Sequence, residues 1–190
     1  MSGTHPPIVG SNASPPALTR WQGRWFTEQD TEAFARALAA ALPTLPGGQD
    51  ACIELQGNLG AGKTTLVRHL LRAAGVQGRI KSPTYAVVEP HEAQGPQGAW
   101  PVWHFDFYRF SDPREWEDAG FRDIFAGPGL KLMEWPDKVA GQLPVPDWVI
   151  AIEALDESER RVQLQAGTAR GSQWLRAAQD TLWREAPRAL

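Results

Sequence analysis

One stretch constrains this chain more than any other. Residues 57–64 fit the phosphate-binding loop pattern G-x-x-x-x-G-K-[ST] at every fixed position. Glycines let such a loop adopt positive φ and approach a ligand closely, so that successive N–H groups turn toward phosphate oxygens. Lys63 is expected to contact the β- and γ-phosphates, and Thr64 to give its hydroxyl to Mg²⁺. The residues expected to bind nucleotide are Gly57, Asn58, Leu59, Gly60, Ala61, Gly62, Lys63, Thr64 and Thr65.

The sequence on either side of this loop supplies the setting that the motif needs. Ala51–Gln56 is predicted to be a strand, and Thr64–Ala74 an amphipathic helix that ends at Gly75. The positive end of that helix would point at the same phosphates. Strand, loop and helix together favour a nucleotide site over an incidental glycine-rich turn.

Composition narrows the class of protein. A chain of 190 residues is long enough for one domain with a proper core. The formal net charge of −3 gives no general attraction to nucleic acid. The single cysteine, Cys52, excludes an intramolecular disulfide and a cysteine-built metal site. No apolar run is long enough to cross a bilayer, so we expect a cytoplasmic protein without membrane contact.

The remaining pattern predicts an α/β fold, a P-loop NTPase-like three-layer sandwich with a mixed β-sheet. Residues 1–20 are expected to be a disordered Pro-rich tail, 21–166 an ATPase domain, and 167–190 a C-terminal helix packed on or extending that domain. The other predicted elements are a strand at Trp21–Phe26, a helix from Thr27 to Leu42, strands at Ala86–Glu89 and Trp100–Phe107 around a loop at Pro90–Gly98, a broken helix from Arg114 to Phe125, a strand at Leu130–Met133, an edge hairpin of Trp148–Glu153 and Arg160–Gln165, and a helix at Gln173–Glu185.

Two carboxylates are predicted to lie beside the loop. Asp106 and Glu134 each close a strand, and ligands of open α/β sheets bind at the carboxyl ends of strands. We expect Glu134 to coordinate magnesium and Asp106 to position water or support the metal, although the pattern leaves the division of these roles open. His104, two residues before Asp106 in an aromatic strand, could act as a base but is interpreted as a hydrogen-bonded packing residue.

A hydroxyl-bearing loop follows the first helix after the phosphate-binding motif. Ser82 and Thr84 flank Pro83, and such a loop can reach a γ-phosphate or its magnesium in nucleotide-switch proteins. We therefore predict a switch-like segment here, with Thr84 as its functional hydroxyl. Trp135, next to Glu134, is expected either to pack beside the nucleotide or to pack in the core.

Four sequence blocks together carry a resemblance to a known family. GNLGAGKTT, KSPTY followed by VVEP, HFDFYR followed by SDP and GFRD, and LMEWP resemble the TsaE family, also called YjeE, from about Trp25 to Arg161. The resemblance implies a cytosolic ATPase of low intrinsic activity that binds ATP and Mg²⁺. It implies that the chain, as a monomer or weak dimer, acts with the proteins TsaB and TsaD in making threonylcarbamoyladenosine in tRNA, touching the tRNA only through that complex.

The resemblance also assigns roles by matching position. Lys63 and Thr64 match the phosphate and metal residues, and Thr84 the switch-like segment. Asp106 matches the catalytic acid, and Glu134 the magnesium-associated acid. Trp135 matches a tryptophan near the nucleotide. The Pro-rich start and the residues after Gln165 depart from the family outline and receive no role.

Two other functions use the same residues. A small-molecule P-loop kinase would need the same loop and the same acids. A nucleotide-switch binding module would use the segment around Thr84, but the chain lacks an N-K-x-D-like guanine-reading motif, because Asp137-Lys138 is followed by Val139 and has no asparagine before it.

Overall fold

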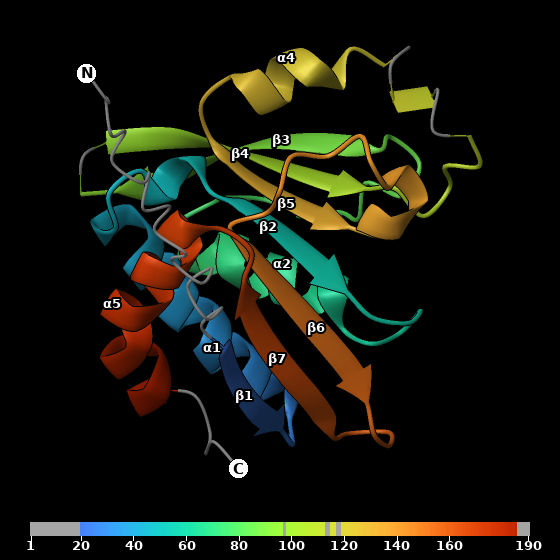
Figure 1. Ribbon diagram of the computed structural model, residues 1–190. Helices are drawn as coiled ribbons and strands as arrows, with labels where there is room; N and C mark the ends of the chain where they lie inside the picture. The colour runs from blue at the N-terminus through green and yellow to red at the C-terminus, as the bar shows by residue number, and fades with distance from the viewer. Residues whose placement is uncertain (1–19, 97, 113–114, 117–118, 186–190) are drawn as a thin grey trace, which may run out of the picture.

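The computed structural model describes residues 20–96, 98–112, 115–116 and 119–185. These residues form a seven-stranded mixed sheet with the strand order β1-β7-β6-β2-β5-β4-β3 (Figure 1). Strands β6, β2, β5 and β4 run parallel to one another, whereas β1, β7 and β3 pair antiparallel with their neighbours. The predicted α/β class with a mixed sheet is confirmed.

The elements follow the predicted order closely. The strands are β1 (Arg20–Trp25), β2 (Cys52–Gln56), β3 (Val88–Gly95), β4 (Gly98–Asp106), β5 (Leu130–Glu134), β6 (Trp148–Ala154) and β7 (Arg160–Ala166). The α-helices are α1 (Glu28–Ala41), α2 (Lys63–Ala73), α4 (Phe121–Ala126) and α5 (Ala169–Glu185). Short 3₁₀ turns are η1 (Leu42–Thr44), η2 (Gly48–Asp50) and η3 (Pro136–Val139).

Helices cover the sheet unequally on its two faces. Figure 1 shows α1, α2 and α5 on one face and α4 on the other, over β3, β4 and β5. Each face has its own core: Val102 and Leu132 belong to the larger cluster under the three helices, and Phe105 and Met133 to the aromatic cluster under α4. Strand β5 is buried along its whole length, as expected for a parallel strand covered on both faces.

Alternation along β4 places its side chains as the sequence predicts. Val102 is in the larger core, whereas Phe105 and Phe107 pack in the aromatic cluster. His104 and Asp106 lie on the same face of the strand as Val102, because they follow it by two and four residues. Because Asp106 pairs with Glu134 across β4 and β5, both carboxylates come to one edge of the sheet. That edge is also where β2 enters the phosphate-binding loop.

The predicted capping box at the start of α1 is present. Thr27 is the N-cap residue, and its backbone N–H donates to the Asp30 carboxylate at 3.0 Å. The helix then buries Phe34 and Leu38, and Phe34 packs against the rings of Trp21 and Trp25 at centroid distances of 5.2 and 5.3 Å. This contact attaches β1 to the helical layer.

The region predicted as a loop at Pro90–Gly98 is largely a strand, and that prediction was wrong. β3 runs through it and pairs with β4 from Val88 opposite Phe105 to Gly95 opposite Gly98. A proline without an N–H and several polar residues are compatible with a strand here because β3 is at the edge of the sheet.

The strand predicted from Ala86 begins two residues later for a backbone reason. Val87 has a φ of 66°, in the left-handed region that β-branched residues rarely adopt. Its N–H donates to the Pro83 carbonyl at 2.6 Å, so residues 83–87 form a tight turn before the strand. The switch-like segment therefore ends at a strained residue.

Two predictions near the C-terminus also differ from the structure. The hairpin of β6 and β7 is not at the sheet edge, because β1 pairs with β7 and takes the edge position. The last helix begins at Ala169 instead of Gln173, with Gly171 inside it. The predicted tail at residues 1–20 lies almost wholly outside the described residues, as does part of the broken helix from Arg114.

Candidate functional site

The phosphate-binding loop joins β2 to α2 with glycines where only glycine fits. Gly57 has a φ of 146°, and a Cβ there would lie 2.3 Å from the Ile152 carbonyl oxygen. Gly62 has a φ of 110° and is the N-cap residue of α2. These conformations expose the start of the helix, whose first N–H groups have no partner within the helix. The result is a concave seat for an anion.

Lys63 folds back over this loop. Its Nζ donates to the carbonyls of Gly57 at 2.6 Å and Asn58 at 3.0 Å, and it lies 3.9 Å from the centre of the Trp135 ring. Burial lowers the pKa of the Lys63 ammonium, and the nearby carboxylates, chiefly Glu134 and then Asp106, partly offset that effect. The lysine is thus a buried cation without a carboxylate in direct contact among the described residues.

Glu134 is held at both carboxylate oxygens. Oε2 accepts from the Thr64 hydroxyl at 2.8 Å, and Oε1 lies 2.8 Å from Nε2 of His104. Glu134 is only 2% exposed and His104 is fully buried. The end of β5, the start of α2 and the middle of β4 therefore meet in one chain of hydrogen bonds.

Asp106 is held by the switch-like segment. Its Oδ2 accepts from the Thr84 hydroxyl at 2.6 Å and from the Ser82 hydroxyl at 3.2 Å, and its Oδ1 accepts from the Tyr108 N–H at 3.0 Å. The two hydroxyls also lie 2.7 Å apart. Asp106 is 3% exposed, so a small rearrangement of this segment would change both its hydrogen bonds and its access to solvent.

Trp135 closes the site from the side of β5. It has a φ of 57°, which is uncommon for a non-glycine residue, and its ring packs on Tyr108 at a centroid distance of 5.0 Å. Together with the contact to Lys63, this places the ring between the loop and the residues that follow β4. Backbone strain of this kind is concentrated at functional sites in proteins.

A cleft of about 270 Å³ connects these groups. Its lining residues are Leu59, Gly60, Ala61, Gly62, Lys63, Thr64, Thr65, Ser82, Thr84, Asp106, Tyr108, Glu134 and Trp135. Gly57 and Asn58 do not line this cleft, but their carbonyls accept hydrogen bonds from Lys63, which does. The other predicted site residues all line the cleft, although they come from four separate segments of the chain.

The oxygen-rich donor set fits magnesium better than a softer metal. A hydroxyl and two carboxylates are hard ligands, and Mg²⁺ is commonly held by one or two carboxylates together with substrate phosphates. Within the part of the chain that the structure describes, no group of three or more His, Cys, Asp or Glu residues could hold a metal ion. A magnesium ion at this cleft would therefore need further ligands, such as water or the oxygens of a bound phosphate.

A second cleft opens on the other side of the same loop residues. It measures about 260 Å³ and shares Gly60, Ala61, Gly62 and Thr65 with the first cleft. Its remaining lining residues are Trp25, Thr27, Glu28, Thr31, Glu157, Ser158 and Arg160. Arg160 is fixed there, because its Nε donates to the Ala61 carbonyl at 3.1 Å.

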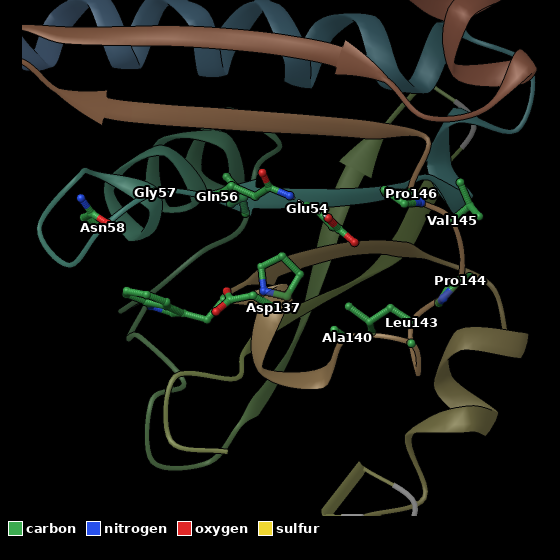
Figure 2. Close-up of a pocket in the computed structure, with 14 residues that line it drawn as sticks. Glu54, Gln56, Gly57, Asn58, Asp137, Ala140, Leu143, Pro144, Val145 and Pro146 are labelled. Atoms are coloured by element: carbon green, nitrogen blue, oxygen red, sulfur yellow. Dashed lines mark hydrogen bonds between the residues drawn. The ribbon is translucent and has the colours of Figure 1, made fainter. Parts of the chain in front are cut away.

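A larger hollow of about 600 Å³ lies beside the loop but away from the start of α2 (Figure 2). Glu54 and Gln56 of β2 form one wall, and Asp137 of η3 and the segment 143–146 form others. Burial raises the pKa of Glu54. Because this hollow has carboxylates and lacks the N–H groups of the helix start, it is poorly suited to phosphates.

Sequence reasoning missed two contributors to the site and did not find the partner of a third. His104 is buried and hydrogen-bonded, as interpreted, but its partner Glu134 was not predicted; the alternation that places His104 on the same strand face as Asp106 was the available signal. Tyr108 and Arg160 were given no role, although Tyr108 packs on Trp135 and Arg160 contacts the loop. Their positions depend on chain segments that meet only in three dimensions.

Comparison with known proteins identifies the family of this chain. The family model described as threonylcarbamoyl adenosine biosynthesis protein TsaE matches residues 26–162. The chain belongs to the TsaE family. This membership confirms the resemblance drawn from the four sequence blocks, and the family takes part in threonylcarbamoyladenosine biosynthesis.

Curated relatives of this TsaE-family chain are found in distant bacteria. The tRNA threonylcarbamoyladenosine biosynthesis protein TsaE of Haemophilus influenzae is 40% identical over 138 residues, covering 73% of this chain and 84% of the relative. The protein of the same name from Bacillus subtilis is 32% identical over 145 residues, covering 76% and 86%.

A solved structure supports the fold of this family member. The crystal structure of Bacillus subtilis YdiB superposes with a TM-score of 0.66 at 24% identity, covering 87% of this chain and 98% of that one. Separately, among the helices that the structure describes, none is both long and apolar enough to span a membrane.

Proposed function

We propose that this chain binds ATP with Mg²⁺ and hydrolyses it, and that hydrolysis supports threonylcarbamoyladenosine formation in tRNA by driving turnover of a TsaB–TsaD complex. The observation that carries the proposal is the convergence on one cleft of Lys63, the Thr64–Glu134 hydrogen bond and the Thr84–Asp106 hydrogen bond. P-loop hydrolases need a phosphate-binding lysine, a metal-binding hydroxyl and acid, and a group that orients water.

The phosphates would lie across the start of α2. There Lys63 would exchange its loop carbonyls for phosphate oxygens, which is favourable because charge-assisted hydrogen bonds are the stronger ones. The γ-phosphate would face the cleft with Asp106, and the nucleoside would enter the cleft lined by Thr31, Ser158 and Arg160. The two clefts share four loop residues, so a nucleotide lying across those residues would extend from one cleft into the other.

Glu134 and Asp106 would have different roles. Glu134 and Thr64 would hold Mg²⁺, which when bound neutralises charge on the phosphates. Asp106 would release Thr84 and accept a hydrogen bond from the attacking water. Thr84 would then be free to turn toward the γ-phosphate, as hydroxyls of switch segments do.

Substitution of Asp106 tests the hydrolysis directly. We expect Asp106→Asn to lower the rate of phosphate release about 100-fold, the lower limit for loss of a general acid–base group. The dissociation constant for ATP should stay within about threefold, because the loop and Lys63 are unchanged. Glu153→Gln is the matched control, since Glu153 is an exposed acid that pairs with Arg161 and does not line the cleft with Asp106. Hydrolysis by Asp106→Asn at the wild-type rate would contradict the assignment.

The same assay separates the wider functions. Phosphate release should rise when TsaB and TsaD are added together, and indifference to them would reject the partner part of the proposal. Transfer of labelled phosphate to a metabolite, detected by mass spectrometry, would instead identify a small-molecule kinase. Nucleotide binding that gates partner binding without any phosphate release would indicate a switch module.

A further inference from the structure

His104 is a buried polar residue in a place where an apolar one would pack at less cost. It lies in β4 opposite Leu132 of β5 and is fully buried. Val102, two residues earlier on the same strand face, is part of the apolar core. Burying an imidazole here is unfavourable unless its polar atoms are used.

One nitrogen of the ring has a single, well-defined use. Nε2 lies 2.8 Å from Oε1 of Glu134, whose Oε2 accepts from Thr64. An ionised carboxylate only accepts hydrogen bonds, so Nε2 carries the proton and donates it. The other nitrogen, Nδ1, is buried and has no hydrogen-bond partner among the described residues. Among the described residues, the hydrogen bond to Glu134 is therefore the only one that uses a polar atom of the His104 ring.

The contact removes a freedom that Glu134 would otherwise have. The glutamate is the last residue of β5, and beyond it the chain turns sharply at Trp135 with a φ of 57°. A carboxylate bonded only to Thr64 could pivot about that one contact. Bonding the second oxygen to His104, which is fixed inside the core, defines the plane of the carboxylate and the oxygen that faces Thr64.

We propose that His104 is a positioning residue that orients Glu134 for a divalent cation at the nucleotide site. This inference rests on the proposed function, because it takes Glu134 to be the metal-associated acid. It goes beyond that function by adding to the site a residue that touches neither nucleotide nor metal. Groups that hydrogen-bond to ligating side chains commonly change metal affinity 10- to 100-fold when they are removed.

Three substitutions at His104 separate orientation from packing. His104→Phe keeps a ring and loses the donor. His104→Gln keeps a donor at the reach of Nε2, whereas His104→Asn carries a donor that is too short to reach Glu134. The measurement is Mn²⁺ binding to the full chain with ADP, followed by electron paramagnetic resonance, together with ADP affinity in chelator and the thermal unfolding midpoint.

We expect His104→Phe and His104→Asn to weaken Mn²⁺ binding about 10-fold or more, and His104→Gln to stay within about threefold of wild type. ADP affinity without metal should stay within about threefold for all three, because Lys63 and the loop are unchanged. If His104 only packed in the core, its substitution would change the unfolding midpoint, and the Gln and Asn variants would bind Mn²⁺ with equal affinity. If His104→Phe does not fold, the two amide variants still decide.

The outcomes distinguish this inference from the proposed function. Equal Mn²⁺ affinity in wild type and His104→Phe, or equal weakening in the Gln and Asn variants, would overturn the positioning role and leave the ATPase proposal standing. Failure of the wild-type chain to bind ADP or Mn²⁺ at all would overturn the proposed function, and the positioning role would fall with it.

Discussion

Lys63 shows how burial sets the chemistry of a single residue. Its pKa is lowered from the ordinary value of 10.5 mainly by desolvation, with Glu134, Asp106 and Asp137 acting in the opposite direction. A bound triphosphate would favour the charged form and raise that pKa again. Binding should therefore take up protons over the interval between the lowered pKa and the pKa in the complex.

This gives a pH dependence with a definite sign. The affinity for a non-hydrolysable ATP analogue should fall as pH rises through the lowered pKa of Lys63 in the free chain, by at most about tenfold per pH unit for one proton. Isothermal titration calorimetry in buffers of different ionisation enthalpy would measure both affinity and proton uptake. Lys63→Arg is the control, because a guanidinium stays charged throughout this range. A wild-type affinity that does not change with pH would contradict the linkage.

Single residues also show where sequence reasoning succeeds. Asp106 and Glu134 were located correctly because strand alternation and the phosphate-binding motif both constrain them. The partner of His104 was not predicted, because Glu134 is thirty positions away and only the register of β4 and β5 brings the two side chains together. The sequence around a histidine among aromatic residues is the same whether its side chain only packs or also orients a neighbouring side chain.

At the scale of elements, Asp147 fastens the last helix to the sheet. Its buried carboxylate accepts from the Cys52 N–H at 3.1 Å, the Thr168 hydroxyl at 2.8 Å, and Nε and Nη2 of Arg170 at 3.0 and 2.6 Å. Donors from β2, the end of β7 and the start of α5 therefore share one acceptor. Removal of that acceptor would leave several of them unpaired.

We expect Asp147→Ala to lower the free energy of unfolding by about 1–3 kcal/mol, the cost of leaving buried hydrogen-bond donors unsatisfied, because Arg170 is half-exposed and can turn to solvent. Urea unfolding followed by tryptophan fluorescence would measure the loss. Glu153→Ala is the matched control: it breaks the exposed pair with Arg161 and should cost no more than about 1 kcal/mol. Equal costs for the two substitutions would show that Asp147 is not the fastening group.

Element boundaries were predicted well where a local rule fixes them. The capping box at Thr27 sets the start of α1, and the glycine-rich loop sets the start of α2. The part of β3 from Pro90 onward was missed because Pro90 and its polar neighbours favour a turn locally, and only the edge position in the sheet makes them acceptable in a strand. The start of β3 was also displaced by Val87, whose left-handed backbone conformation no sequence rule predicts for valine.

For the whole molecule, β1 protects an edge of the sheet. It pairs with β7 from Arg20 opposite Gln165 to Trp25 opposite Arg160, and it buries Trp21 and Trp25. Without β1, the backbone groups on one side of β7 would be unpaired, and exposed edges of this kind promote association. The strand order that places β1 there could not be read from the sequence, because nothing local shows which strand it will join.

Two truncations test this arrangement. A chain lacking residues 1–25 should be destabilised by at least about 3 kcal/mol, the usual cost of losing one buried tryptophan, and should aggregate in light scattering. A chain lacking residues 1–19 is the control and should stay within about 0.5 kcal/mol of the full chain, because the predicted tail has little to bury. If the shorter truncation destabilises the fold as much as the longer one, the tail prediction is wrong.

The pairing of β1 with β7 also has a consequence for biosynthesis. Arg20 leaves the ribosome early, but its partner Gln165 is made about 145 residues later. At roughly 5–20 residues per second, the first strand waits about 7–30 s before its partner exists. During that interval α1 can form and cover Trp21 and Trp25 only from its own side. Completion of this edge of the sheet therefore waits for the synthesis of β7, and a nascent chain stalled before β7 presents an unpaired aromatic strand to chaperones.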